Sequence, residues 1–437
     1  MSWDYRFGAL IFISTLVDYI LAIYIEKTEI QSRRFNLLQI SLILNLIAIL
    51  GFFKYYNFAS DNVNSLFILF GFEKALPDLK IILPVGVSFF TFQSMSYTID
   101  VYRKEIEVEK SFIRFALFVS FFPQLVAGPI VTAKTFIPQL YRDSEFEDIP
   151  FLKAIRYFFL GYIKKVIISD NISPIVDLIY SNPENYGATA TWLASILFIA
   201  QIYCDFSGYT DMAYSSALLL GYELPENFRL PLICSSFTDF WRRWHISLSS
   251  WLKEYLYFSL GGSKVGYLRH KLNLVLTMLI AGLWHGASWN FVLWGGLQGV
   301  IMAVENAYSG YVIKKYGKEV ANRKIPFLRY IFQNFLTLLF FTFIGTLFRT
   351  GDMKNELLIL KNFINFSDLG LRPYMVKIGF SAIIALIMGN VIGIYIYERN
   401  VKLMIPKYAE FIFYIFSSLF LSLLTNDNLT PFIYFQF

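Results

Sequence analysis

Cysteine, histidine and charged residues are all scarce in this sequence. Its 437 residues include two cysteines and three histidines, and Asp, Glu, Lys and Arg together make up 16%. Cys204 and Cys234 are too few for a disulfide framework and fit no metal-ligand spacing, so we expect no metal site. Soluble domains carry about 25% charged residues. The low charge content, without any long polar interval, predicts a chain with no large soluble domain.

Apolar residues fill most of the chain instead. Hydrophobic residues make up 56% of the sequence and aromatic residues 19%. Because a helix needs about 20 apolar residues to cross a bilayer, we expect an all-α polytopic membrane protein with about ten or eleven membrane segments. These would form a single membrane-embedded domain over residues 1–437. The expected segments lie near residues 7–25, 35–58, 81–101, 112–132, 151–180, 189–221, 272–304, 326–348, 373–397 and 408–425.

Basic residues predict how these segments are oriented. Lys and Arg follow the segments that end near residues 25, 101 and 304, and they precede the segment that begins near residue 408. The positive-inside rule therefore places these four loops in the cytoplasm and both ends of the chain outside. Such loops also explain the net charge of +6. We expect no nucleic-acid partner, because aromatic and aliphatic residues fill the segments between the loops.

One apolar segment, Leu272–Tyr308, contains a titratable residue. His285 follows Trp284 about a dozen residues into the segment, and Ser288 and Asn290 come soon after. An ionisable residue at such a depth in a membrane segment indicates a functional site. If both flanks are cytoplasmic, the segment must enter the membrane and return to the cytoplasmic side, with His285 near the turn. A single long tilted helix is the alternative geometry.

A second segment, Asp239–Leu260, has aromatic residues at helical spacing. Trp241 and His245 belong to its apolar side, whereas Arg242 and Arg243 fall largely elsewhere on the helical wheel. This pattern predicts one amphipathic helix in the cytoplasmic interface, with tryptophans among the lipid headgroups and arginines in water. Residue type alone does not distinguish a functional His245 from one that only forms hydrogen bonds within a membrane-anchoring helix.

Six long motifs occur in order between about residues 80 and 300. They are LPVGVSFFTFQSMSYTIDVYR, FFPQLVAGPI, QIYCDFSGYTDMA, LPENFRLP, FWRRWHISLSSWLKEYLYFSLGG and GLWHGASWNFVLWGG. Together they resemble the membrane-bound O-acyltransferase (MBOAT) family, in particular its bacterial branch of alginate and peptidoglycan O-acetylation proteins. The resemblance implies an MBOAT-like helical core over about residues 80–305, C-terminal helices over 326–425, and a multi-pass protein of the bacterial cytoplasmic (inner) membrane.

The same resemblance assigns roles to two histidines. It makes His285, in the WHG motif, the catalytic histidine and His245, in the RWH motif, the second histidine. It also implies acetyl-CoA as the donor substrate with no bound cofactor, and an extracytoplasmic acceptor that is either a polysaccharide or a partner protein relaying acetyl to it. The chain departs from the family at Lys253-Glu254, where Arg-Asp is common, and at Cys204, where an aromatic residue is common.

Acyl transfer to a hydroxyl group requires a base. A sugar or serine hydroxyl attacks a thioester poorly unless its proton is removed during attack. Histidine suits this role because desolvation keeps the ring neutral, so we expect His285 to be the general base. A covalent acyl-imidazole intermediate is the alternative. Trp284, Ser288 and Asn290 are candidates to orient the ring or to bond the developing oxyanion.

Three further residues are candidates for substrate binding. Arg242 and Arg243 could bind the phosphates of coenzyme A, although cations beside tryptophans are more often interfacial anchors. Trp241, directly before them, completes this group.

Two other functions stay open. Within the family, the alternative is transfer of D-alanine from a carrier-protein thioester toward teichoic acid. In a different class, the chain would be a transporter of polysaccharide or lipid. The transporter hypothesis predicts two related halves with broken helices at corresponding positions, and the sequence shows no such repeat.

Overall fold

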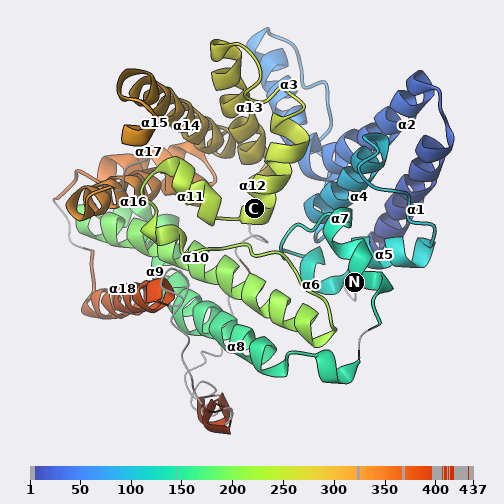
Figure 1. The fold of residues 1–437 in the computed structure, drawn as a ribbon. Helices are drawn as coiled ribbons and strands as arrows, with labels where there is room; N and C mark the ends of the chain where they lie inside the picture. Colours follow the sequence, from blue (N-terminus) through green and yellow to red (C-terminus); the bar gives the residue numbers. More distant parts are fainter. Residues whose placement is uncertain are drawn as a thin grey trace. The chain divides into compact units, whose positions relative to one another are not determined.

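The computed structural model describes residues 5–143, 145–321, 325–366 and 370–395, together with positions 406, 408–410, 412, 414–417 and 432. All regular secondary structure in these ranges is helical, which confirms the all-α prediction (Figure 1). The chain forms two compact units, Met1–Ala154 with Ser216–Pro225 and Ile155–Ser215 with Glu226–Phe437. The single membrane domain expected from hydropathy stays a prediction.

The first unit is built around helix α1. This helix packs against α2, α4 and α5, and its buried Asp18 accepts hydrogen bonds from Ser41 (2.6 Å) and Asn45 (2.9 Å). These bonds satisfy a carboxyl group that lies away from water. The helices of this unit are α1 (Tyr5–Lys27), α2 (Gln31–Ile43), η1 (Leu44–Tyr55), α3 (Tyr56–Leu69), α4 (Val87–Tyr102), α5 (Phe112–Ser120), α6 (Phe122–Leu125), α7 (Ala133–Phe136), η2 (Ile137–Tyr141) and η3 (Phe146–Asp148).

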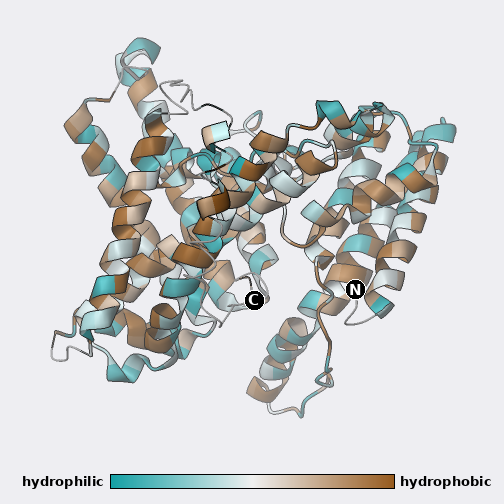
Figure 2. Cartoon of the chain, turned by 90° about the horizontal axis from the view of Figure 1, so that it is seen from below, coloured by the Kyte–Doolittle hydropathy of each residue, from teal (hydrophilic) through white to brown (hydrophobic). Residues whose placement is uncertain are grey.

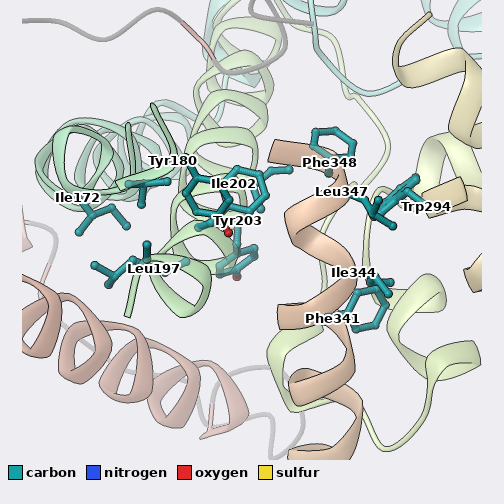
Figure 3. Close-up of a cluster of buried hydrophobic side chains, with 14 of the residues drawn as sticks. Ile172, Tyr180, Leu197, Ile202, Tyr203, Trp294, Phe341, Ile344, Leu347 and Phe348 are labelled. Carbon is teal, nitrogen blue, oxygen red and sulfur yellow. The ribbon is translucent and has the colours of Figure 1, made fainter. Parts of the chain in front are cut away.

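The second unit contains most of the remaining helices. Buried aromatic and aliphatic side chains from α9, α10, α14 and α16 form its core, as the close-up in Figure 3 shows for Tyr180, Leu197, Trp294 and Phe348. Its helices are α8 (Phe151–Tyr162, which begins in the first unit), η4 (Ile163–Ser169), α9 (Asp170–Ser181), η5 (Pro183–Asn185), α10 (Ala188–Leu219, whose end belongs to the first unit), η6 (Pro231–Ile233), α11 (Phe237–Arg243), α12 (Ile246–Trp251), η7 (Leu252–Tyr257), α13 (Tyr267–His285), α14 (Trp289–Tyr316), α15 (Lys318–Ala321), α16 (Phe327–Thr350), α17 (Met353–Asn362) and α18 (Pro373–Gly393).

Apolar residues recur along the helices of both units (Figure 2). Five helices of the described ranges are long and apolar enough to cross a membrane: Tyr5–Lys27, Gln31–Leu69, Ala188–Leu219, Phe327–Thr350 and Pro373–Gly393. They coincide with five of the expected segments. The segment expected near 81–101 is the 16-residue helix α4, only about 24 Å long. Most of the segment expected over 408–425 lies outside the described residues, so the total of ten or eleven stays a prediction.

Helices α13 and α14 form a hairpin that carries His285 at its turn. His285 is the last residue of α13, and α14 begins at Trp289. Where the two arms cross, a Cβ atom on Gly295 would lie 2.2 Å from the carbonyl oxygen of Met278. Only glycine permits so close an approach. The segment turns back on itself, so a single long helix is excluded, whereas its entry into the membrane and return to the cytoplasm stay a prediction.

The segment Asp239–Leu260 is not the single amphipathic helix that its periodicity predicts. Helix α11 ends at Arg243 and α12 begins at Ile246, and between them His245 adopts a left-handed conformation with φ 42° and ψ 53°. Trp241, in α11, is buried at 7% exposure. The aromatic side therefore packs inside the protein and not among lipid headgroups. Periodicity identified an apolar side, but it could not distinguish contact with a protein core from contact with lipid.

Candidate active site

A small cavity of about 40 Å³ lies in the second unit. Side chains from α10, α11, α13, α14 and α16 surround it. His285 is the one titratable residue among those that line it, and the others are aromatic or aliphatic. The lining residues are Phe198, Ile199, Ile202, Phe240, Trp241, Trp244, His285, Trp294, Phe341, Gly345 and Phe348. Apolar walls with one convergent polar group are typical of a small-molecule site.

Aromatic rings surround the imidazole of His285. Its centroid lies 4.9 Å from the ring of Trp284, 5.2 Å from that of Trp294 and 5.3 Å from that of Phe348, each in an edge-to-face arrangement. The residue is 5% exposed. These rings fix the orientation of the imidazole by packing and keep bulk water away from it. The sequence prediction that His285 belongs to a desolvated chamber agrees with this geometry.

Trp241 enters the same cavity from α11. Its indole N–H donates a 2.7 Å hydrogen bond to Oε1 of Gln298, a fully buried residue of α14. Its ring lies 6.1 Å from that of Trp294, nearly edge-to-face. The structure thus brings together two of the residues selected from sequence, Trp241 and His285, although they are far apart in the chain.

A carboxylate on α14 holds the N-terminus of α11. Glu305 accepts hydrogen bonds from the main-chain N–H of Phe237 (2.8 Å) and of Thr238 (2.9 Å), and from the hydroxyl of Thr238 (2.8 Å). Glu305 and Gln298 were not predicted from the sequence as residues of the site. They are the only acidic residue and the only glutamine of α14, and their spacing places them on one face about two turns apart. Those polar side chains in an apolar segment were the available signal.

The second histidine, His245, does not line the cavity. It is completely buried, its Nδ1 lies 3.1 Å from Oδ1 of Asn227, and its ring centroid lies 4.7 Å from that of Phe206. The ring of Trp284 lies 6.1 Å from it, so Trp284 contacts the rings of both histidines. Burial lowers the pKa of His245 to about 3, so this ring is neutral.

Ser288 and Asn290 do not line the cavity. The side-chain amide of Asn290 donates a 3.1 Å hydrogen bond to the hydroxyl of Thr350, which in turn donates to Glu356 (3.0 Å). This chain of bonds ties the start of α14 to α16 and α17. Ser288 precedes the first residue of α14. Their expected contacts with an oxyanion stay predictions.

The two arginines of α11 also lie outside the cavity. Arg242 is exposed, and Arg243 forms a 3.0 Å ion pair with Asp239 one turn earlier. A role in binding phosphate groups therefore requires the charged part of the ligand to remain outside the cavity. Within the described ranges, no cluster of three His, Cys, Asp or Glu side chains could hold a metal ion.

Comparisons with known proteins agree with the motifs. Residues 103–366 match the model of the MBOAT, membrane-bound O-acyltransferase family. The chain is 40% identical over 306 residues to the Probable alginate O-acetylase AlgI of Azotobacter vinelandii, which covers 70% of this chain and 60% of that protein. It is 33% identical over 397 residues to the Peptidoglycan O-acetyltransferase of Helicobacter pylori, covering 84% of this chain and 72% of that protein.

A more distant relative carries a different name. The chain is 25% identical over 280 residues to the Teichoic acid D-alanyltransferase of Bacillus subtilis, which covers 62% of this chain and 70% of that protein. The match to the alginate-type relative spans about 60% of that protein's length. The family model covers more than half of the present chain. This chain belongs to the membrane-bound O-acyltransferase family.

Proposed function

We propose that this protein is an O-acetyltransferase of the bacterial cytoplasmic membrane. It moves an acetyl group from cytoplasmic acetyl-CoA to an extracytoplasmic hydroxyl group, for O-acetylation of a cell-surface polysaccharide either directly or through a partner protein. The observation that carries the proposal is the position of His285 in an aromatic cavity, in a chain whose relatives at 40% and 33% identity are named as O-acetylating proteins.

The reaction moves one proton from the acceptor hydroxyl to the leaving thiolate by way of His285. As the acceptor oxygen attacks the thioester carbonyl carbon, the imidazole takes the hydroxyl proton. The new C–O bond forms, the C–S bond breaks, and the proton passes from the imidazole to the departing thiolate of coenzyme A. A positioned base contributes roughly 10²–10⁴-fold to such a reaction.

The apolar lining of the cavity decides which part of the donor enters it. The acetyl group and its thioester carry no charge, so hydrocarbon walls do not oppose their entry. The nucleotide of coenzyme A carries phosphates, and burying them among these rings would be costly. We place the nucleotide outside the cavity, with Arg242 and Arg243 as candidate partners of its phosphates. Excluding water also protects the thioester from hydrolysis.

D-alanyl transfer is the second candidate. The 25% identity to a teichoic acid D-alanyltransferase supports it, and the donor would then be a carrier-protein thioester. Acetyl transfer is preferred because the relatives named for O-acetylation match at higher identity. Membership of an acyltransferase family argues against the transporter reading.

A comparison of the two donors, each supplied separately, distinguishes these candidates. The purified protein, reconstituted in nanodiscs, is given acetyl-CoA labelled in the acetyl group or a D-alanyl carrier-protein thioester, each with an extracytoplasmic hydroxyl acceptor. We expect acceptor-dependent release of coenzyme A and label on the acceptor. Turnover of the carrier thioester alone would establish the second candidate, and consumption of neither donor would contradict acyl transfer. Label retained on the protein would favour the acyl-imidazole route.

A further inference from the structure

We propose that Asn227 is a positioning residue that fixes the tautomer of His245, with the hydrogen on Nδ1 and the lone pair on Nε2. The proposal deepens the proposed function, on which its catalytic consequence rests. Asn227 belongs to the LPENFRLP motif, to which the sequence assigned no role. Its side chain lies 3.1 Å from His245 although the two residues are 18 positions apart.

The orientation of the Asn227 amide follows from a main-chain donor. Its Oδ1 accepts a hydrogen bond from the main-chain N–H of Ser247 (3.2 Å) and another from the Ser247 hydroxyl (2.8 Å). Oxygen and nitrogen of a side-chain amide are easily exchanged in a structure, so their assignment needs an independent partner. A main-chain N–H can only donate. The atom that faces it must therefore be the oxygen.

The same oxygen determines the hydrogen on the imidazole. Nδ1 of His245 lies 3.1 Å from Oδ1 of Asn227, and an amide oxygen can only accept. Nδ1 must therefore carry a hydrogen. A neutral imidazole has one N–H, which leaves Nε2 as an acceptor. The ring is neutral because its burial disfavours the charged form.

Asn227 also holds the backbone that presents this histidine. Its carbonyl oxygen accepts from the N–H of Ile246 (3.0 Å), and its side chain accepts from the N–H of Ser247. These are the first two residues of α12, whose N–H groups have no partner within the helix. His245, directly before them, has the left-handed conformation that histidine seldom adopts. One asparagine thus caps α12 and fixes both the position and the tautomer of the ring.

The consequence is a neutral hydrogen-bond acceptor beside Trp284. Nε2 of His245 is buried and has no hydrogen-bond partner in the described part of the chain. His245 does not line the cavity, so a substrate group reaches this atom only if the side chains between them move, and that group must carry a hydrogen. In the proposed reaction this group is either the acceptor hydroxyl or an amide N–H of the pantetheine arm of the donor. Either group would donate a hydrogen bond to the sp² nitrogen Nε2.

Nuclear magnetic resonance of ¹⁵N-histidine protein in nanodiscs tests the tautomer without any substrate. The His245 signals are identified by their loss in His245→Gln. We expect Nδ1 protonated and Nε2 unprotonated at neutral pH in the wild type, in Asn227→Asp, which keeps an oxygen acceptor, and in the control Ser247→Ala, which keeps the main-chain donor. Asn227→Leu should lose this preference. Nε2 protonated in the wild type would overturn the proposal, and so would an unchanged tautomer in a folded Asn227→Leu. If Asn227→Leu does not fold, the wild-type tautomer decides.

Kinetics of the same variants test the consequence. We expect Asn227→Leu to lower kcat/KM for acetyl transfer by about tenfold or more, the scale known for residues that orient metal-bound histidines. Asn227→Asp should retain most of the wild-type kcat/KM, in contrast to Asn227→Leu. A raised KM for acetyl-CoA would identify the pantetheine amide as the bound group, and a raised KM for the acceptor would identify the hydroxyl. Full activity in a folded Asn227→Leu would contradict the catalytic consequence. Because the tautomer is read without substrate, a wrong donor assignment leaves the first test intact.

Discussion

Trp241 and Gln298 form a buried hydrogen bond of 2.7 Å between α11 and α14. It fixes the indole at the wall of the cavity that contains His285, and the indole in turn packs against Trp294 on the same arm of the hairpin. The first prediction concerns this pair, because the shape of the cavity depends on where α11 lies relative to α14.

Gln298→Leu should lower both thermal stability and acetyl transfer. It leaves the indole N–H of Trp241 buried without an acceptor, which costs about 1–3 kcal/mol. Trp241→Phe removes the donor as well, so the double variant should lose less than the sum of the two single variants. Unfolding midpoints and transfer rates of the four proteins measure this coupling. Strictly additive losses would show that the bond does not position the wall.

Gly295→Ala should destabilise the hairpin. The added Cβ would lie 2.2 Å from the carbonyl oxygen of Met278, so the two arms must separate. Overpacking of this kind costs about 1–3 kcal/mol. Gly310→Ala is the matched control on the same helix, since no atom lies within 4 Å of its added Cβ. There alanine should stabilise α14 by up to about 1 kcal/mol. Equal unfolding midpoints for the two variants would contradict the close crossing.

Glu356 should make stability depend on pH. It is buried and accepts hydrogen bonds from Thr346 (2.7 Å) and Thr350 (3.0 Å). Burial, with a smaller contribution from the nearby Asp352 carboxylate, raises the pKa of Glu356 above its ordinary value of 4.5. The folded state therefore holds this proton to higher pH than the unfolded state does. The stability contribution is complete below that ordinary value and is lost as the pH rises through the raised pKa.

Glu356→Gln removes this titration. Unfolding midpoints of the wild type, measured from acidic to neutral pH, should fall more steeply than those of the variant over that window. Parallel curves would mean that Glu356 does not hold a proton in the folded protein.

The sequence alone predicted the features that depend on residue types and their order along the chain. A histidine in an apolar segment can be recognised in this way. Its place near the turn of a hairpin was one of two geometries that the sequence left open, and the helix break between α13 and α14 decides between them. The break at His245 is not visible, since the bonds that hold its left-handed conformation come from Asn227, 18 residues earlier. The partner of Trp241 is 57 residues away. Such contacts depend on how helices pack, and neither periodicity nor hydropathy contains that information.

The proposed reaction depends on His285 as the base for acetyl transfer. The most direct measurement compares transfer from labelled acetyl-CoA to the acceptor in nanodiscs for the wild type, His285→Ala and His270→Ala, a histidine on the same helix outside the cavity. We expect His285→Ala to insert and fold normally yet lose on the order of 10²–10⁴-fold in rate, while His270→Ala transfers acetyl like the wild type. Wild-type rates in a folded His285→Ala would contradict the claim.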